Sequence, residues 1–226
     1  MRVELSSGRT SRLASILDGA MADPQRYPIP RARARAEVVI ERSRFICTLA
    51  PAESPEAAHA FVREMSHEFD DATHNCWAFV AGPPGSTARI GMSDDGEPHG
   101  TAGRPMLTVL LHAGVGEIAA VVTRYYGGTK LGTGGLARAY SGAVQEALSR
   151  LERHERVETT DLRVRVGYHA FAAVRHLLPT YEAHVLNERY DDAVELTLRV
   201  PVMQLVALRL AIGNATGGQE QYLPEE

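Results

Sequence analysis

The sequence predicts an α+β protein of two domains, and three observations support this fold class. The 226 residues are 44% hydrophobic and 23% charged, which is ordinary for a chain that folds into globular domains. Short strand-like and helix-like segments alternate over residues 31–151. After a charged stretch without apolar periodicity at residues 152–160, the order changes to the β-α-β-β-α-β pattern of a split βαβ fold over residues 161–226. We therefore expect an N-terminal domain, a linker and a C-terminal domain over these three ranges.

The first 30 residues fit neither domain. They lack the apolar segment of a signal peptide and show no sustained periodicity, so we expect residues 1–30 to be a disordered extension, with Met21 as an alternative start. The longest apolar runs, such as Ile118–Val122, are far too short to cross a bilayer. The two cysteines, Cys47 and Cys76, are expected to be free thiols in a reducing compartment. These features predict a cytoplasmic protein without membrane contact.

Local signals place the elements of the N-terminal domain. Ser54 and Pro55 predict a helix start, because Ser is a common N-cap and Pro is tolerated in the first turn. The segment Glu117–Tyr125 is the most apolar strand-like run, so we expect it at the centre of the sheet. The expected strands lie at 38–40, 45–49, 75–81, 88–92 and 117–125, and the expected helices at 55–69, from about 102 or 104, and at 136–151.

The same kinds of signal place the elements of the C-terminal domain, where strands and helices follow a different order. The expected strands lie at 162–168, 183–190 and 194–200, the helices at 171–178 and 202–212, and a last strand within 217–223 closes the sheet. Residues 152–226 contain 12 acidic and 8 basic residues. This excess of acid does not favour binding of a polyanion by the second domain.

Nine of the 20 glycines are concentrated in two windows, residues 91–103 and 127–135. The second window lies between the expected central strand and a helix, where backbone amides and a dipole of about half a positive charge can hold an anion. Residues Gly132–Ala137 match a dinucleotide fingerprint, but the glycines lie too far past the strand and no ribose-binding acid follows. A Walker loop is excluded because Leu131 follows Lys130. Two interpretations stay open: a loop that binds phosphate or a partner's carboxylate, and glycines that only make tight turns.

We assign a binding site to this region. Basic side chains would contact phosphate or an acidic protein surface, glycine amides would shape the cleft, and Tyr125 or Tyr126 would stack on a base. Lys130 is the single lysine among 24 basic residues, so it is a candidate for a role that Arg does not fill. The assigned binding residues are Arg104, Arg124, Tyr125, Gly127, Gly128, Lys130, Gly132, Gly134, Gly135 and Arg138.

Three carboxylates in the first window, Asp94, Asp95 and Glu97, are assigned a supporting role. They could hold Mg²⁺ or act as acid and base, they could form turns with their own backbone, or they could pair with basic residues and join the two glycine windows. His74 and Cys76 share a strand face, but no second pair of ligands with matching spacing exists, so we assign no metal site.

Four motifs carry a resemblance to a known family. They are Arg42–Ile46, His74–Ala78, Asp94–Pro105 and Thr123–Leu136, and on them the chain resembles the YigZ/Impact family from about residue 35 to its C-terminus. The resemblance implies an N-terminal domain similar to the second domain of a small-subunit ribosomal protein. It also implies a ferredoxin-like C-terminal domain similar to domain V of elongation factor G. Bacterial members look like ribosome- or RNA-associated proteins.

From the residues and the resemblance together we expect a non-enzymatic, translation-associated regulator. Its partner would be RNA, the ribosome or an acidic translation-associated protein, bound in the basic glycine-rich cleft. We assign no catalytic residue, metal or cofactor. The alternative is an enzyme that acts on a small phosphorylated or peptide-like substrate with metal-assisted carboxylates.

Overall fold

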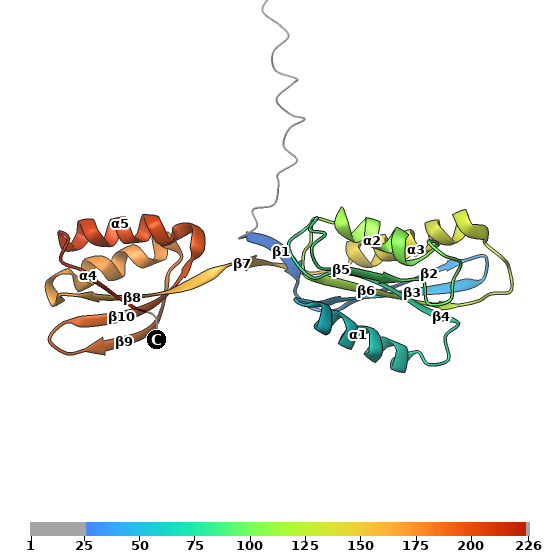
Figure 1. Ribbon diagram of the computed structural model, residues 1–226, viewed down its shortest axis with the longest axis horizontal. Coiled ribbons are helices and arrows are strands. Elements are labelled where there is room, and N and C mark those ends of the chain that lie inside the picture. Colours follow the sequence, from blue (N-terminus) through green and yellow to red (C-terminus); the bar gives the residue numbers. More distant parts are fainter. Residues whose placement is uncertain (1–25, 225–226) are drawn as a thin grey trace, which may run out of the picture. The chain divides into compact units, whose positions relative to one another are not determined.

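The chain folds into two compact units that meet in sequence at His154 and Glu155 (Figure 1). The computed structural model describes residues 26–224. Within these residues no helix is long and apolar enough to cross a membrane. The predicted α+β class with two domains is confirmed.

The first unit is built on a five-stranded antiparallel sheet with the order β2-β3-β6-β4-β5. The predicted central strand is confirmed: β6 has seven of its eight residues buried, because both of its faces are covered. The strands are β2 Ala34–Ile40, β3 Ser43–Pro51, β4 His74–Val80, β5 Ile90–Ser93 and β6 Ile118–Tyr125.

Helices cover both faces of this sheet (Figure 1). Helix α1, Pro55–Glu68, packs on one face and begins as predicted, since the Ser54 hydroxyl accepts a hydrogen bond of 3.2 Å from the Ala57 amide. Helices α2, Gly103–Leu111, and α3, Gly132–Ser149, pack on the other face.

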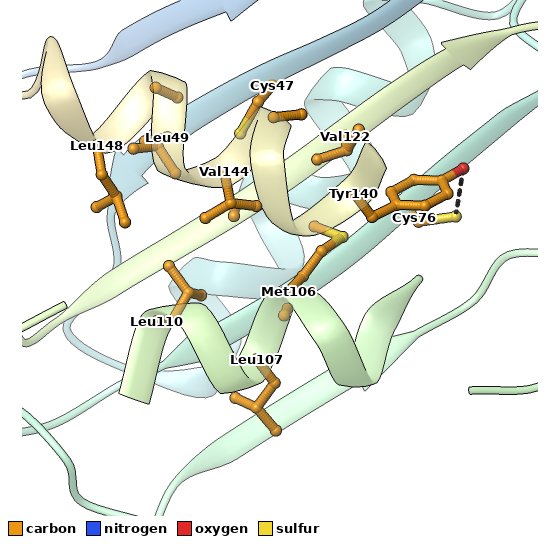
Figure 2. Packing of buried hydrophobic residues seen from close by; sticks show 14 of the residues in the cluster. Cys47, Leu49, Cys76, Met106, Leu107, Leu110, Val122, Tyr140, Val144 and Leu148 are labelled. Atoms are coloured by element: carbon orange, nitrogen blue, oxygen red, sulfur yellow. Dashed lines mark hydrogen bonds between the residues drawn. The ribbon is translucent and has the colours of Figure 1, made fainter. Parts of the chain in front are cut away.

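Side chains of β6 alternate between the two cores. Ala119 and Val121 pack towards α1, whereas Ala120 and Val122 pack towards α2 and α3. Figure 2 shows Val122 in the latter core, together with Met106, Tyr140 and Val144. The same alternation puts Arg124, at the end of β6, on the side of α3.

The second unit has the predicted β-α-β-β-α-β order. Its antiparallel sheet has the order β11-β8-β10-β9, the arrangement of a ferredoxin-like domain, and its helices pack on one face, where the core lies. The elements are β8 Thr159–Val166, α4 Tyr168–Leu177, a 3-10 turn Leu178–Tyr181, β9 His184–Tyr190, β10 Val194–Pro201, a 3-10 turn Val202–Gln204, α5 Leu205–Thr216 and β11 Gln221–Leu223.

Two strands lie where the sequence predicted none. Strand β1, Arg26–Pro30, falls in the expected extension, and β7, Arg153–Val157, falls in the expected linker; they form a separate two-stranded sheet. Pairing through the backbone needs no apolar alternation, so the charged sequence of β7 gave no signal. Tyr27 is buried and donates a 2.9 Å hydrogen bond to Glu117. The rest of the expected extension, with Met21, lies outside the described residues.

Helix α3 begins at Gly132, four residues earlier than predicted. Its first turn therefore contains Gly134 and Gly135, which helix propensity disfavours by about 1 kcal/mol each relative to Ala. The glycine loop proper is short and begins at Gly127, against the tip of the β2-β3 hairpin. A β-carbon on Gly127 would lie only 2.1 Å from the carbonyl carbon of Arg42, so the close approach requires glycine.

We expect Gly127→Ala to lower the free energy of unfolding by about 1–3 kcal/mol, because the added methyl group overlaps rigid backbone. Gly142→Ala is the matched control: it lies within α3, and a β-carbon there meets nothing within 4 Å. The control should be neutral or raise stability by up to about 1 kcal/mol. Urea unfolding followed by circular dichroism measures both variants, and equal stabilities would contradict the close packing.

Candidate functional site

The N-terminus of α3 borders a pocket of about 470 Å³ in the first unit. This volume falls in the usual range for small-molecule sites. The walls come from the start of β4, the loop after β5, the end of β6 and the loop into α3. We call it the α3 pocket; its lining residues are Thr73, His74, Glu97, Pro98, Arg124, Tyr126, Lys130, Leu131, Gly132, Thr133 and Leu136.

A buried ion pair forms the base of the site. Arg124 and Glu97 are only 5% and 8% exposed, and Nη1 of Arg124 donates a 2.5 Å hydrogen bond to Oε1 of Glu97. The hydroxyl of Tyr140, in α3, donates to the same oxygen at 2.8 Å. Burial raises the pKa of Tyr140 far above its ordinary value, so this hydroxyl keeps its proton and remains a donor. The orientation of Arg124 is thereby fixed from two elements.

Arg124 retains unused donors. Its Nε is buried and has no hydrogen-bond partner within residues 26–224. Its Cζ lies 5.4 Å from the ring centroid of Phe45 and 5.5 Å from that of Tyr126. Phe45 belongs to the core, whereas Tyr126 is 47% exposed at the pocket. An unpaired buried donor costs about 1–3 kcal/mol, which a ligand acceptor would recover.

The first turn of α3 is uncapped. Within residues 26–224 no side chain caps it, and no acidic residue lies in it, although Gly132 and Thr133 line the pocket. The other helices of this unit differ: Ser54 caps α1, and the Asp94 carboxylate binds the amides at the start of α2. The amides of α3 therefore offer an anion site, with Lys130 beside them.

The three supporting carboxylates do not converge. Asp94 accepts bonds of 2.7, 3.0 and 2.8 Å from the amides of Gly100, Ala102 and Gly103, whereas Asp95 accepts one of 2.6 Å from the amide of Asn75. Glu97 binds Arg124. Turn and capping bonds thus account for Asp94, a bond to the backbone of β4 accounts for Asp95, and pairing with a basic residue accounts for Glu97. No group of three His, Cys, Asp or Glu in the described chain could hold a metal ion.

His74 is a pocket residue that sequence reasoning did not select. Its Nδ1 lies 2.6 Å from the carbonyl oxygen of Asp95, and because a carbonyl only accepts, Nδ1 carries the hydrogen. Its Nε2 lies 4.0 Å from Oε1 of Glu97. The cross-strand pairing of His74 with Arg124 brings it here. That register was the missing information, because the two residues are 50 positions apart in sequence.

The assigned site residues divide into two groups. Glu97, Arg124, Lys130 and Gly132 line the pocket, while Gly127, Gly128, Gly134 and Gly135 lie in the adjoining loop and first turn without lining it. Other assigned side chains are elsewhere: Arg104 is exposed on α2, and Arg138 is exposed on α3.

Tyr126, rather than Tyr125, lines the pocket. Tyr125 follows Arg124 on the strand, so its side chain points to the opposite face of the sheet. There its hydroxyl donates a 2.6 Å hydrogen bond to Asp71, and the guanidinium of Arg44 lies over its ring at 5.3 Å.

Comparisons with known proteins agree with this architecture. The Impact N-terminal domain model matches residues 41–148, and a domain of unknown function (DUF1949) matches residues 164–219. The IMPACT family member YigZ of Escherichia coli is 41% identical over 198 residues, covering 88% of this chain and 97% of the relative. This chain belongs to the IMPACT family.

Another family member and a solved structure are also similar to most of this chain. The IMPACT family member YvyE of Bacillus subtilis is 36% identical over 183 residues, which cover 81% of this chain and 83% of YvyE. A crystal structure of a hypothetical protein, 40% identical, covers 89% of this chain and 98% of its own, with a TM-score of 0.63. The similarity therefore spans both units.

The capping role of Asp94 gives a pH-dependent stability. Burial raises the pKa of Asp94, but the three amide bonds together outweigh it, and the net shift is downward. The stabilisation that the Asp94 carboxylate provides is therefore fully present above the ordinary carboxyl pKa, and it is lost as the pH falls through the lowered pKa.

We expect Asp94→Asn to lower the free energy of unfolding by about 1–3 kcal/mol at neutral pH, since an amide has one acceptor oxygen and no charge. The difference from the unchanged protein should shrink in acid. Denaturant titrations over a pH series measure this, with the exposed Asp70→Asn as control. A difference that stays constant with pH would contradict a charged cap.

Proposed function

We propose that this protein is a translation-associated binding protein that takes RNA in the α3 pocket. One observation carries the proposal: an uncapped helix N-terminus and the side chain of Arg124, whose buried Nε has no hydrogen-bond partner within residues 26–224, line the same pocket. Both groups recognise anionic oxygen atoms, and phosphate is the anion that RNA repeats at every nucleotide.

The electrostatics of the pocket favour an anion. Lys130 and Arg124 bring positive charge, and the dipole of α3 adds about half a charge. Glu97 is the one acidic lining residue, and its Oε1 already accepts from Arg124 and Tyr140. The whole chain has a formal charge of −4, so long-range attraction is absent and binding depends on this local arrangement.

The exposed ring of Tyr126 favours RNA over a bare anion. Aromatic rings beside a basic groove stack on bases, with an effect of about 1–3 kcal/mol per base. Pro98, Leu131 and Leu136 provide apolar walls next to the polar groups. A nucleotide matches this combination of charge and apolar surface better than an acidic protein side chain does. The translation context rests on the resemblance described above.

Replacing Lys130 tests the proposal. We expect Lys130→Ala to weaken binding of a single-stranded RNA oligonucleotide about fivefold and to reduce the slope of log affinity against log salt by about 1. Fluorescence anisotropy over a salt series measures both quantities. Arg104→Ala is the matched control, because Arg104 is exposed on α2 and lies outside the pocket.

Three results would count against RNA as the ligand: no RNA binding, binding that does not respond to salt, or an equal loss in Arg104→Ala. An acidic peptide that binds more tightly than RNA would instead assign the pocket to a protein partner. Lys130→Arg separates charge from shape, since it keeps the charge but replaces a compact ammonium by a planar fork.

A further inference from the structure

We infer that the α3 pocket recognises the terminal monoester phosphate of an RNA end, not a phosphate within the strand. This inference rests on the proposed function and specifies which part of an RNA enters the pocket.

The size of the pocket limits how much of an RNA strand can enter it. A cavity of about 470 Å³ suits one small-molecule ligand, which in an RNA corresponds to a single nucleotide. A strand that tracks through a groove needs positive charge along its path. Here two positive groups, Arg124 and Lys130, line one pocket beside the uncapped N-terminus of α3.

The number of hydrogen-bond donors indicates which kind of phosphate group fits the pocket. Three separate groups can contact the anion: the amides at Gly132 and Thr133, the ammonium of Lys130 and, once a neighbouring group moves, Nε of Arg124. A terminal phosphate presents three free oxygens and a charge of about −1.5 to −2 at neutral pH. An internal diester presents two free oxygens and one charge. The donor set therefore matches the terminal group.

Arg124 is the independent support for a ligand at this helix terminus. Its side chain is almost wholly buried, its Nη1 is held by Glu97, and its Nε has no acceptor in the described part of the chain. Since Nε is shielded from solvent, a ligand oxygen reaches it only after a neighbouring group moves. Tyr126 is half exposed and its ring lies 5.5 Å from Cζ, so a turn of this side chain can admit the phosphate and place the ring against the base.

The test compares RNA oligonucleotides of one sequence that carry a 5′-phosphate, a 3′-phosphate or hydroxyl groups at both ends. We expect at least about tenfold tighter binding of one phosphorylated form in fluorescence anisotropy, because at least one additional charge and one oxygen are recognised. The form preferred identifies which end enters. Inorganic phosphate should compete with that form.

Two isosteric variants keep the result interpretable. Thr133→Asp puts a carboxylate in the first turn of α3, where it stabilises the helix through its dipole while occupying the anion site. Thr133→Asn has the same shape without the charge. We expect the aspartate variant to lose the end preference and the asparagine variant to keep most of it, with both folded by circular dichroism.

The outcomes separate the two proposals. Equal affinity for all three RNAs, or an end preference that survives in Thr133→Asp, overturns recognition of the terminal phosphate but leaves RNA binding standing. Absence of binding to every RNA overturns the proposed function as well.

Discussion

The buried ion pair between Arg124 and Glu97 is the interaction on which the first unit's functional end depends. It joins the end of the central strand to the loop after β5, and the Tyr140 hydroxyl ties both to α3. Removing one partner would leave a buried charge without compensation, which costs about 3–5 kcal/mol. In an ion pair with only a structural role, the polar atoms of both side chains would have hydrogen-bond partners. Here the carboxylate oxygen accepts two donors while the guanidinium keeps a nitrogen unpaired, so the arrangement is asymmetric in favour of another anion.

Whether polar groups have partners also explains why the two glycine windows differ in chemistry although they resemble each other in composition. In the first window the backbone amides are already satisfied by the Asp94 carboxylate, which acts as an internal anion. In the second window no acidic side chain lies in the first turn of α3, and the amides remain available. The amides of the first window thus bind a carboxylate of the same chain. The ligand phosphate that we propose for the second window would make the same kind of contact with backbone amides.

Much of the fold could be predicted from the sequence, for identifiable reasons. A continuous apolar run gave the central strand β6, the pair Ser54 and Pro55 gave the start of α1, and periodicity gave the order of the second unit. The start of α3 was missed because glycines lower helix propensity, and packing of Leu136 and Tyr140 against the sheet overrides that preference. Strand β7 was missed because backbone pairing leaves no pattern of side chains.

Of the four basic residues assigned to the site, Arg124 and Lys130 line the α3 pocket and Arg104 and Arg138 do not, and the geometry of the pocket was not predicted. Choosing between Tyr125 and Tyr126 requires knowing where β6 ends, since alternation holds within the strand and is lost beyond it. His74 could be placed only through the register that sets it opposite Arg124. Lys130 was selected as the single lysine and for its place in the second glycine window, and it lines the α3 pocket. Arg124 is held by Glu97 and cannot follow a ligand, so a second cation that adjusts must come from the loop. A flexible side chain with a compact ammonium has that freedom, whereas a planar guanidinium needs two aligned acceptors to use its donors.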